Sequence, residues 1–137
     1  MDDFQRVLPI LLHLEGGYVH DPSDPGGETK YGISKRAYPL EDIRALTADR
    51  AGALYRRDYW DRLQGDHLPW PLCLVVMDAA VNHGLTRAQS FLALTRDAEV
   101  YLKLREAFYR KIVARRPESA KFLKGWLNRL TYLRNHL

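Results

Sequence analysis

The sequence predicts a mainly α-helical protein with a small β-hairpin or loop after its first helix. Apolar residues recur at helical spacing along most of the chain. Five of the nine glycines fall in one early stretch, residues 15–33, where glycine and proline indicate turns. A length of 137 residues fits one domain, residues 1–137, whose C-terminal part from about residue 85 is helical.

The first helix is expected over residues 2–15, with Asp2 or Asp3 near its N-cap. Pro9 should bend this helix or delay its start, because it lacks a backbone donor. The pair Gly16-Gly17 supplies a C-terminal stop. The apolar residues at helical spacing are Phe4, Val7, Leu8, Leu11, Leu12 and Leu14.

The next stretch reads as turns and short extended pieces. Residues 18–19 and 30–33 are expected to pair as a small hairpin, and residues 40–46 to form a short helix. Thr47 is a suitable N-cap for a helix that runs to about Gln64. Its expected buried stripe consists of Ala51, Leu54, Tyr55, Tyr59 and Leu63.

The second half of the chain is expected to be entirely helical. Residues 72–81 are apolar nearly all round, which predicts a central buried helix. Thr86 should cap a helical region that reaches Arg115, with a break near residues 95–97. The last helix is expected over residues 118–134.

Composition limits the functional classes without selecting one. The net charge of +4 and the isoelectric point near 9.3 suit nucleic acid, an anionic membrane or an acidic wall polymer equally well. The last third is rich in Arg and Lys, which a solvated helix face explains as well as a binding surface does. No recognised nucleic-acid motif is present. The single Cys73 is expected to be a buried structural thiol, and the scattered histidines have no zinc spacing.

The chain is expected to be made in the cytoplasm and to remain outside the bilayer. Its acidic start, Met1-Asp2-Asp3, does not resemble a secretory signal. No apolar run approaches the roughly 20 residues that a membrane span needs. An activity outside the membrane would therefore require a separate release route.

The chemistry is expected to depend on Glu15. A carboxylate at the C-terminal end of a helix meets the negative end of the helix dipole, which favours its protonated form. A protonated acid can donate to a leaving group. Asp21 and Asp24 follow on a turned loop, where they should stay ionised. Such a pair suits glycoside hydrolysis, with about 5–5.5 Å between the carboxyl groups for a covalent intermediate or about 6.5–9.5 Å for an attacking water.

Each further candidate also has a structural interpretation. Asp24 is either a catalytic carboxylate or an acceptor in its own turn. Thr29 is either a hairpin residue or a group that orients water, and Tyr31 either packs or lines a cleft. Asp78 and Asn82 share one face of the buried helix, where structural hydrogen bonding is the better interpretation.

The sequence resembles glycoside hydrolase family 108, the N-acetylmuramidases. The matching segments are Glu15-Gly16-Gly17-Tyr18-Val19, Asp21-Pro22, Asp24-Pro25-Gly26-Gly27, Thr29, Tyr31-Gly32-Ile33, residues 55–61, residues 78–82 and residues 125–129. The resemblance implies a lysozyme-like fold and cleavage of the β-1,4 bond between N-acetylmuramic acid and N-acetylglucosamine in peptidoglycan. The family's catalytic glutamate corresponds to Glu15.

The resemblance gives the following assignments. Catalysis is assigned to Glu15, Asp24 and Thr29, and substrate binding to Asp21, Tyr31 and Asn82, with no metal or cofactor. A monomeric phage or prophage endolysin is expected, released to the cell wall by a holin or an export route. Residues 94–99 replace a longer glycine-rich segment of the family, so the C-terminal half is shortened. That shortening leaves an inactive peptidoglycan-binding protein as an alternative, and a lytic transglycosylase is another.

Overall fold

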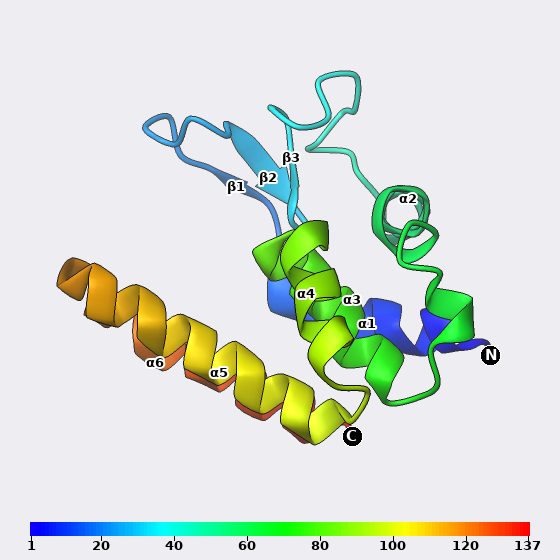
Figure 1. Ribbon diagram of the computed structural model, residues 1–137. Coiled ribbons are helices and arrows are strands. Elements are labelled where there is room, and N and C mark those ends of the chain that lie inside the picture. The colour runs from blue at the N-terminus through cyan, green and yellow to red at the C-terminus, as the bar shows by residue number, and fades with distance from the viewer. The chain divides into compact units, whose positions relative to one another are not determined.

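The computed structural model describes all of residues 1–137 and confirms a mainly α-helical chain with a small antiparallel sheet (Figure 1). The helices are α1 (Asp3–Glu15), α2 (Ala48–Tyr55), α3 (Leu72–His83), α4 (Leu85–Leu94), α5 (Ala98–Arg115) and α6 (Ala120–Arg134). The strands are β1 (Val19–His20), β2 (Glu28–Lys30) and β3 (Ile33–Ser34). Short helical turns are η1 (Arg56–Trp60), η2 (Gly65–His67) and η3 (Pro117–Ser119). The chain forms two compact units, Met1–Asp61 and Arg62–Leu137.

Helix α1 begins and ends where the sequence predicts. Asp2 caps it, because its carboxylate accepts from the Gln5 N–H at 2.8 Å while the Gln5 side chain accepts from the Asp2 N–H at 3.0 Å. Pro9 lies on the exposed side of the helix and does not delay its start. Gly16, with φ of 81°, ends the helix, and its N–H donates to the Leu12 carbonyl at 3.0 Å.

The sheet has the order β1-β2-β3, and all of its strands are antiparallel. Thr29 lies at its centre, paired with Val19 on one side and with Ser34 on the other. The residues directly opposite one another in an antiparallel pair point to the same face of the sheet. The side chains of Thr29, Val19 and Ser34 therefore share a face.

The predicted hairpin is wrong in its pairing. Residues 18–19 were expected to pair with 30–33, but β1 pairs with β2, and residues 30–33 are divided between two strands. Tyr31 and Gly32 both have positive φ, of 54° and 78°. Two such residues form the tight turn that joins β2 to β3. The turn reverses the chain within the segment that was expected to form one strand.

The short helix predicted over residues 40–46 is also wrong, since this segment consists of turns. Two lysines of the sheet region donate hydrogen bonds to backbone carbonyl groups of the segment. Lys30 Nζ donates to the Arg44 carbonyl at 3.1 Å, and Lys35 Nζ donates to the Glu41 carbonyl at 2.8 Å. These contacts hold the segment against the sheet in a non-helical conformation.

Thr47 caps α2 as predicted, since its hydroxyl accepts from the Arg50 N–H at 3.1 Å. The predicted end near Gln64 is wrong: α2 is followed by the π-helical turn η1, and Gln64 is left-handed with φ of 54°. A π-turn inserts an extra residue and rotates the faces that follow it. Trp60 is consequently buried, whereas Tyr59 of the predicted stripe is only half-buried.

Helix α3 is the central buried helix of the second unit, as predicted. Helices α4 and α5 pack on it, and α6 packs along α5. Cys73 is buried and free. The predicted break at residues 95–97 separates α4 from α5. Thr86 does not cap α4, because Gly84, with φ of 95°, ends α3 and precedes α4 directly.

Asp78 has the structural role predicted for it. Its carboxylate is buried between Arg105 and Arg129, whose nearest nitrogens lie at 2.8 and 2.7 Å. Burial opposes ionisation of Asp78, but the two guanidinium groups outweigh it and lower its pKa. The three side chains join α3, α5 and α6. None of the helices is both long and apolar enough to cross a membrane.

Candidate active site

Glu15 is the last residue of α1, and its side chain is half-buried. The chain leaves the helix through Gly16, whose carbonyl accepts from the Tyr31 N–H at 3.0 Å. This bond ties the β2–β3 turn to the end of α1. A helix end and a tight turn are thus fastened together at the predicted acid.

The turn touches the Glu15 side chain at Gly32. A Cβ atom on Gly32 would lie 2.8 Å from Glu15 Oε2 and 3.0 Å from Glu15 Cβ, and it would overlap the hydroxyl of Tyr55. Only a glycine leaves this space to the carboxylate and the hydroxyl. The positive φ of Gly32 also favours glycine.

Tyr55 is the third residue that packs at this site, beside Glu15 and Gly32. It is 1% exposed on α2, and its hydroxyl donates to the Tyr31 carbonyl at 2.6 Å. Sequence reasoning placed Tyr55 only in a buried stripe and missed its hydroxyl. Helical spacing shows which residues face inward, but it does not show which backbone carbonyl a buried hydroxyl will reach.

Asp24 lies in the loop of the β1–β2 hairpin, where its carboxylate accepts from the Gly26 N–H at 2.8 Å. A Cβ atom on Gly26 would lie 3.2 Å from Asp24 Oδ1 and 4.0 Å from Ser34 Cβ. The loop at Gly26 therefore lies near Ser34, the partner of Thr29 in the sheet. Asp24 forms its own turn, and it lines a hollow together with His20, Glu28 and Lys35.

That face of the sheet is open within the first unit. Val19, which pairs with Thr29 on it, is 56% exposed. The opposite face is partly covered, since Ile33 on it is 1% exposed and Lys30 donates to the Arg44 carbonyl. Glu28 belongs to the covered face, where its carboxylate accepts from the Tyr18 hydroxyl at 2.8 Å. Thr29 thus lies beside an exposed residue, whereas the Glu28 carboxylate is hydrogen-bonded to Tyr18.

Asp21 stabilises the start of the same loop. Its Oδ1 accepts from the Ser23 hydroxyl at 2.7 Å and from the Ser23 N–H at 2.9 Å. The hydroxyl bond, followed by the backbone bond, lowers the pKa of Asp21 below its usual value. Asp21 is accordingly an ionised carboxylate whose first oxygen is committed to its turn.

The two remaining predicted residues differ in their surroundings. Tyr31 is half-buried in the turn beside Gly32, with Lys30 Nζ 5.7 Å from its ring centroid. Asn82 belongs to the second unit, on α3. Its amide oxygen accepts from the Tyr109 hydroxyl and, at 3.4 Å, from Arg105. The structure therefore brings Tyr31 to Glu15, and it gives Asn82 structural partners.

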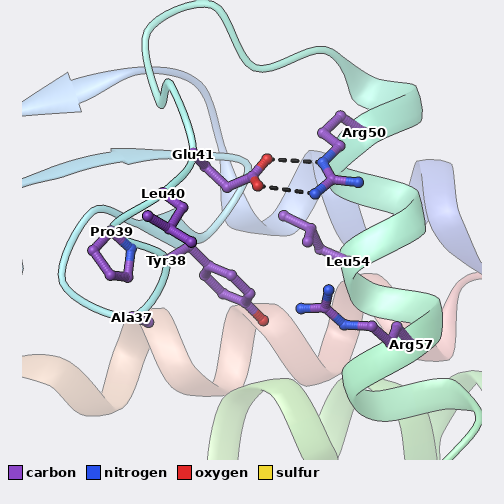
Figure 2. Close-up of a pocket in the computed structure, with 8 residues that line it drawn as sticks. All are labelled: Ala37, Tyr38, Pro39, Leu40, Glu41, Arg50, Leu54 and Arg57. Atoms are coloured by element: carbon purple, nitrogen blue, oxygen red, sulfur yellow. Dashed lines mark hydrogen bonds and ion pairs between the residues drawn. The ribbon is translucent and has the colours of Figure 1, made fainter.

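Two hollows open on the first unit. One, of about 370 Å³, is bordered by residues 24–28 of the hairpin loop together with His20, Lys35 and Arg36. The other, of about 280 Å³, lies between the 37–41 loop and α2 with its continuation (Figure 2). Arg50 lines the second hollow and is held by Glu41 through two bonds of 2.8 and 2.9 Å. No cluster of His, Cys, Asp or Glu side chains is arranged to hold a metal ion.

The arrangement is suited to acid catalysis. The half-buried Glu15 side chain lies where the end of α1 meets the β2–β3 turn, and the same small sheet carries Thr29 on its central strand and Asp24 in its β1–β2 loop. The donor could protonate a leaving oxygen, while the other groups act on the opposite side of a bound chain.

Comparison with known proteins agrees with this chemistry. The profile of the family described as Glycosyl hydrolase 108 matches residues 8–84, a segment that contains every predicted site residue. The chain is similar to a solved structure described as Brucella abortus SagA, with 28% identity and a TM-score of 0.76. The match covers 98% of this chain and 92% of that one. No curated protein matches the chain.

The family match covers more than half of the chain, and the structural match extends over nearly all of it. The resemblance drawn from the Glu15 to Ile33 motifs and the predicted lysozyme-like, mainly α fold are both confirmed. The protein is therefore a glycoside hydrolase, and the chain belongs to the glycosyl hydrolase 108 family.

Proposed function

We propose that this glycoside hydrolase degrades peptidoglycan and cleaves the β-1,4 bond between N-acetylmuramic acid and N-acetylglucosamine. The observation that carries the proposal is the position of Glu15, half-buried against Gly32 and the Tyr55 hydroxyl at the end of α1. The family supports a glycan substrate. The peptidoglycan specificity rests on the sequence motifs that contain Glu15, Asp24 and Thr29.

In this mechanism Glu15 donates its proton to the glycosidic oxygen as the bond from that oxygen to C1 of the muramic acid breaks. Positive charge develops on the sugar ring. Asp24, or Asp21, stabilises this charge or takes a proton from the water that adds to C1. Thr29 orients that water from the open strand face. The products are two glycan ends, one of which is a reducing end.

The test is digestion of purified peptidoglycan by the full chain, followed by mass spectrometry of the fragments. The proposal predicts reducing N-acetylmuramic acid ends, and it predicts that Glu15→Gln produces none while keeping the wild-type circular dichroism spectrum. Binding of the glycan by the wild-type protein without any new ends would instead identify an inactive peptidoglycan-binding protein.

A lytic transglycosylase is the second candidate, and one observation favours it. Asp21 Oδ1 and Asp24 Oδ1 are both committed to backbone donors of their own turns. A transglycosylase needs only one carboxyl group: after Glu15 protonates the leaving oxygen, the 6-hydroxyl of the muramic acid attacks C1 and returns its proton to Glu15. The product is an anhydro end, which differs from a reducing end by the mass of one water.

The biological setting belongs to the same proposal. An enzyme made in a bacterial cytoplasm reaches the wall only after release, by a holin or an export route. We expect a phage or prophage endolysin that acts as a monomer. Expression inside bacteria should leave the cells intact until the membrane is permeabilised, and it should then lyse them. Lysis without permeabilisation would contradict the need for a partner.

A further inference from the structure

The positive charge of the chain is concentrated at the junction of α5 and α6. Residues 110–124 contain six Lys and Arg and one acidic residue, Glu118, which gives this segment a net charge of +5. The whole chain carries +4, so the remainder is slightly negative. The basic residues of the segment are Arg110, Lys111, Arg115, Arg116, Lys121 and Lys124.

These cations face solvent. All six are exposed, and only Arg110 has an acidic partner, Glu106, at 3.1 Å. A cation in the last turn of a helix is favoured by the helix dipole, which accounts for Arg115 on α5. Lys121 lies at the start of α6, where the dipole disfavours a positive charge and no acidic residue compensates it. Helix stability therefore does not explain the whole cluster.

Apolar side chains are interleaved with the cations. Phe122 is 51% exposed, with Lys121 Nζ 5.2 Å from its ring centroid. Trp126, half-buried, lies one turn further along α6, with its ring centroid 5.9 Å from that of Phe122. An exposed aromatic ring among lysines is typical of segments that rest on a bilayer surface.

This end of the α5–α6 pair is not covered by the rest of its unit. The two helices run side by side and are joined at this end by η3 (Figure 1). Tyr109 is the last buried residue of α5, and Leu130 is the first of α6. Between them no side chain is fully buried, although Ile112, Val113, Leu123 and Leu127 are apolar. We call residues 110–124 with Trp126 the hairpin tip.

We propose that the hairpin tip docks the protein on an anionic phospholipid surface, with its lysines and arginines among the headgroups and Phe122 in the interfacial layer. The net charge of +5 opposes a second copy of the same surface. A soluble polyanion would satisfy the cations but would leave Phe122 without a partner. The docking is peripheral, and it does not depend on the hydrolase activity.

The test is co-sedimentation of the full chain with vesicles of phosphatidylcholine alone or mixed with phosphatidylglycerol. We expect binding to the mixed vesicles only. The double variant R115Q/R116Q should lower the partition coefficient by about tenfold or more, since each basic residue contributes substantially near an anionic surface. Phe122→Ser should lower it several-fold without changing the charge.

The matched control is R96Q/K103Q, which removes two exposed cations of the same unit outside the tip. It should retain wild-type partition, and all variants should keep the wild-type circular dichroism spectrum. Equal loss in the control and the R115Q/R116Q variant would overturn the proposal, because it would show a response to total charge. Equal binding to the two vesicle types, or retention of R115Q/R116Q and Phe122→Ser on mixed vesicles, would overturn it as well.

Discussion

The carboxyl group of Glu15 lies directly against the backbone of Gly32. Any larger residue at position 32 would occupy the space that this carboxyl group fills. A Cβ atom at Gly32 would lie 2.8 Å from Glu15 Oε2 and would overlap the Tyr55 hydroxyl. The glycine of a tight turn thus determines the position of the acid. This relationship joins the end of α1 to the sheet.

Substitution of Gly32 should therefore impair both folding and catalysis. Gly32→Ala must shift Glu15 or Tyr55, and it places a side chain at φ of 78°. We expect a loss of about 1–3 kcal/mol in the free energy of unfolding and of roughly 100-fold in kcat/KM. Urea denaturation and a reducing-end assay measure the two effects.

Gly125→Ala is the matched control. A Cβ atom at Gly125, inside α6, would meet no atom within 4 Å. This substitution should leave activity unchanged and stabilise the protein by about 0.5–1 kcal/mol. Equal activity losses in the two variants would show that Gly32 has no special relation to Glu15.

The role of the Tyr55 hydroxyl in catalysis can be tested by comparison with a similar tyrosine-to-carbonyl hydrogen bond in the second unit. Tyr55→Phe removes the donor to the Tyr31 carbonyl, and Tyr101→Phe removes a donor to the Ala88 carbonyl in the second unit. Each should cost about 1–3 kcal/mol of unfolding free energy, because a carbonyl in a buried or partly buried contact loses its donor. Only Tyr55→Phe should also lower kcat. Comparable kcat values in the two variants would exclude a role for Tyr55 in positioning the turn beside Glu15.

The second carboxylate can be identified with substitutions that preserve the turns. An asparagine oxygen can still accept from the Gly26 N–H in Asp24→Asn, or from the Ser23 N–H in Asp21→Asn, while the charge is lost. We expect Asp24→Asn to lower kcat by about 100-fold or more, and Asp21→Asn to act mainly on KM. The reverse pattern would assign the charge-stabilising role to Asp21. Wild-type kcat in both variants would favour the single-carboxylate reaction.

His83 should make the second unit sensitive to acid. Burial, followed by the charge of Arg105, lowers the pKa of His83 to about 3, and its Nε2 accepts from Arg105 Nε at 3.1 Å. In the unfolded chain the His83 side chain binds a proton near pH 6.5, whereas in the folded chain it does so only near pH 3. The free energy of unfolding should therefore fall by on the order of 3 kcal/mol between pH 6.5 and pH 4.

The substitution His83→Gln offers an acceptor that does not titrate. It should flatten the stability profile between pH 6.5 and pH 4, as measured by urea denaturation at each pH. Below about pH 4 a second loss of stability is expected from Asp78, whose pKa is lowered in the folded chain. When Asp78 becomes protonated, its ion pairs with Arg105 and Arg129 are lost. That second decline should persist in the variant. An unchanged slope above pH 4 would contradict the assignment to His83.

Much of the fold follows from local patterns in the sequence. The cap at Asp2, the stop at Gly16 and the buried helix α3 each depend on a few neighbouring residues, so periodicity and capping rules locate them. The helix predicted over residues 40–46 is wrong because the conformation of that segment does not depend on its neighbouring residues alone. Its carbonyl groups are bonded by Lys30 and Lys35, which lie in another part of the chain.

The residues of the candidate site also fall into those that a local pattern identifies and those that contacts between distant segments place. Glu15 is identifiable because a helix end and a glycine pair are read from adjacent residues. The contribution of Tyr55 arises from a contact across 24 residues, which no local pattern reports. The placement of Thr29 and Ser34 on one face depends on the register of β2 with β3, and the predicted pairing of residues 30–33 had that register wrong.

The most direct test of Glu15 as the proton donor compares isosteric substitutions of two glutamates of the first unit. Glu15→Gln keeps the size of the side chain but removes the acid, and Glu28→Gln does the same on the covered face, where the amide oxygen still accepts from Tyr18. Rates of glycosidic bond cleavage on purified peptidoglycan should fall about 100-fold or more in Glu15→Gln and stay near wild type in Glu28→Gln. A Glu15→Gln variant that retains the wild-type rate, or a Glu28→Gln variant that alone loses it, would contradict the assignment.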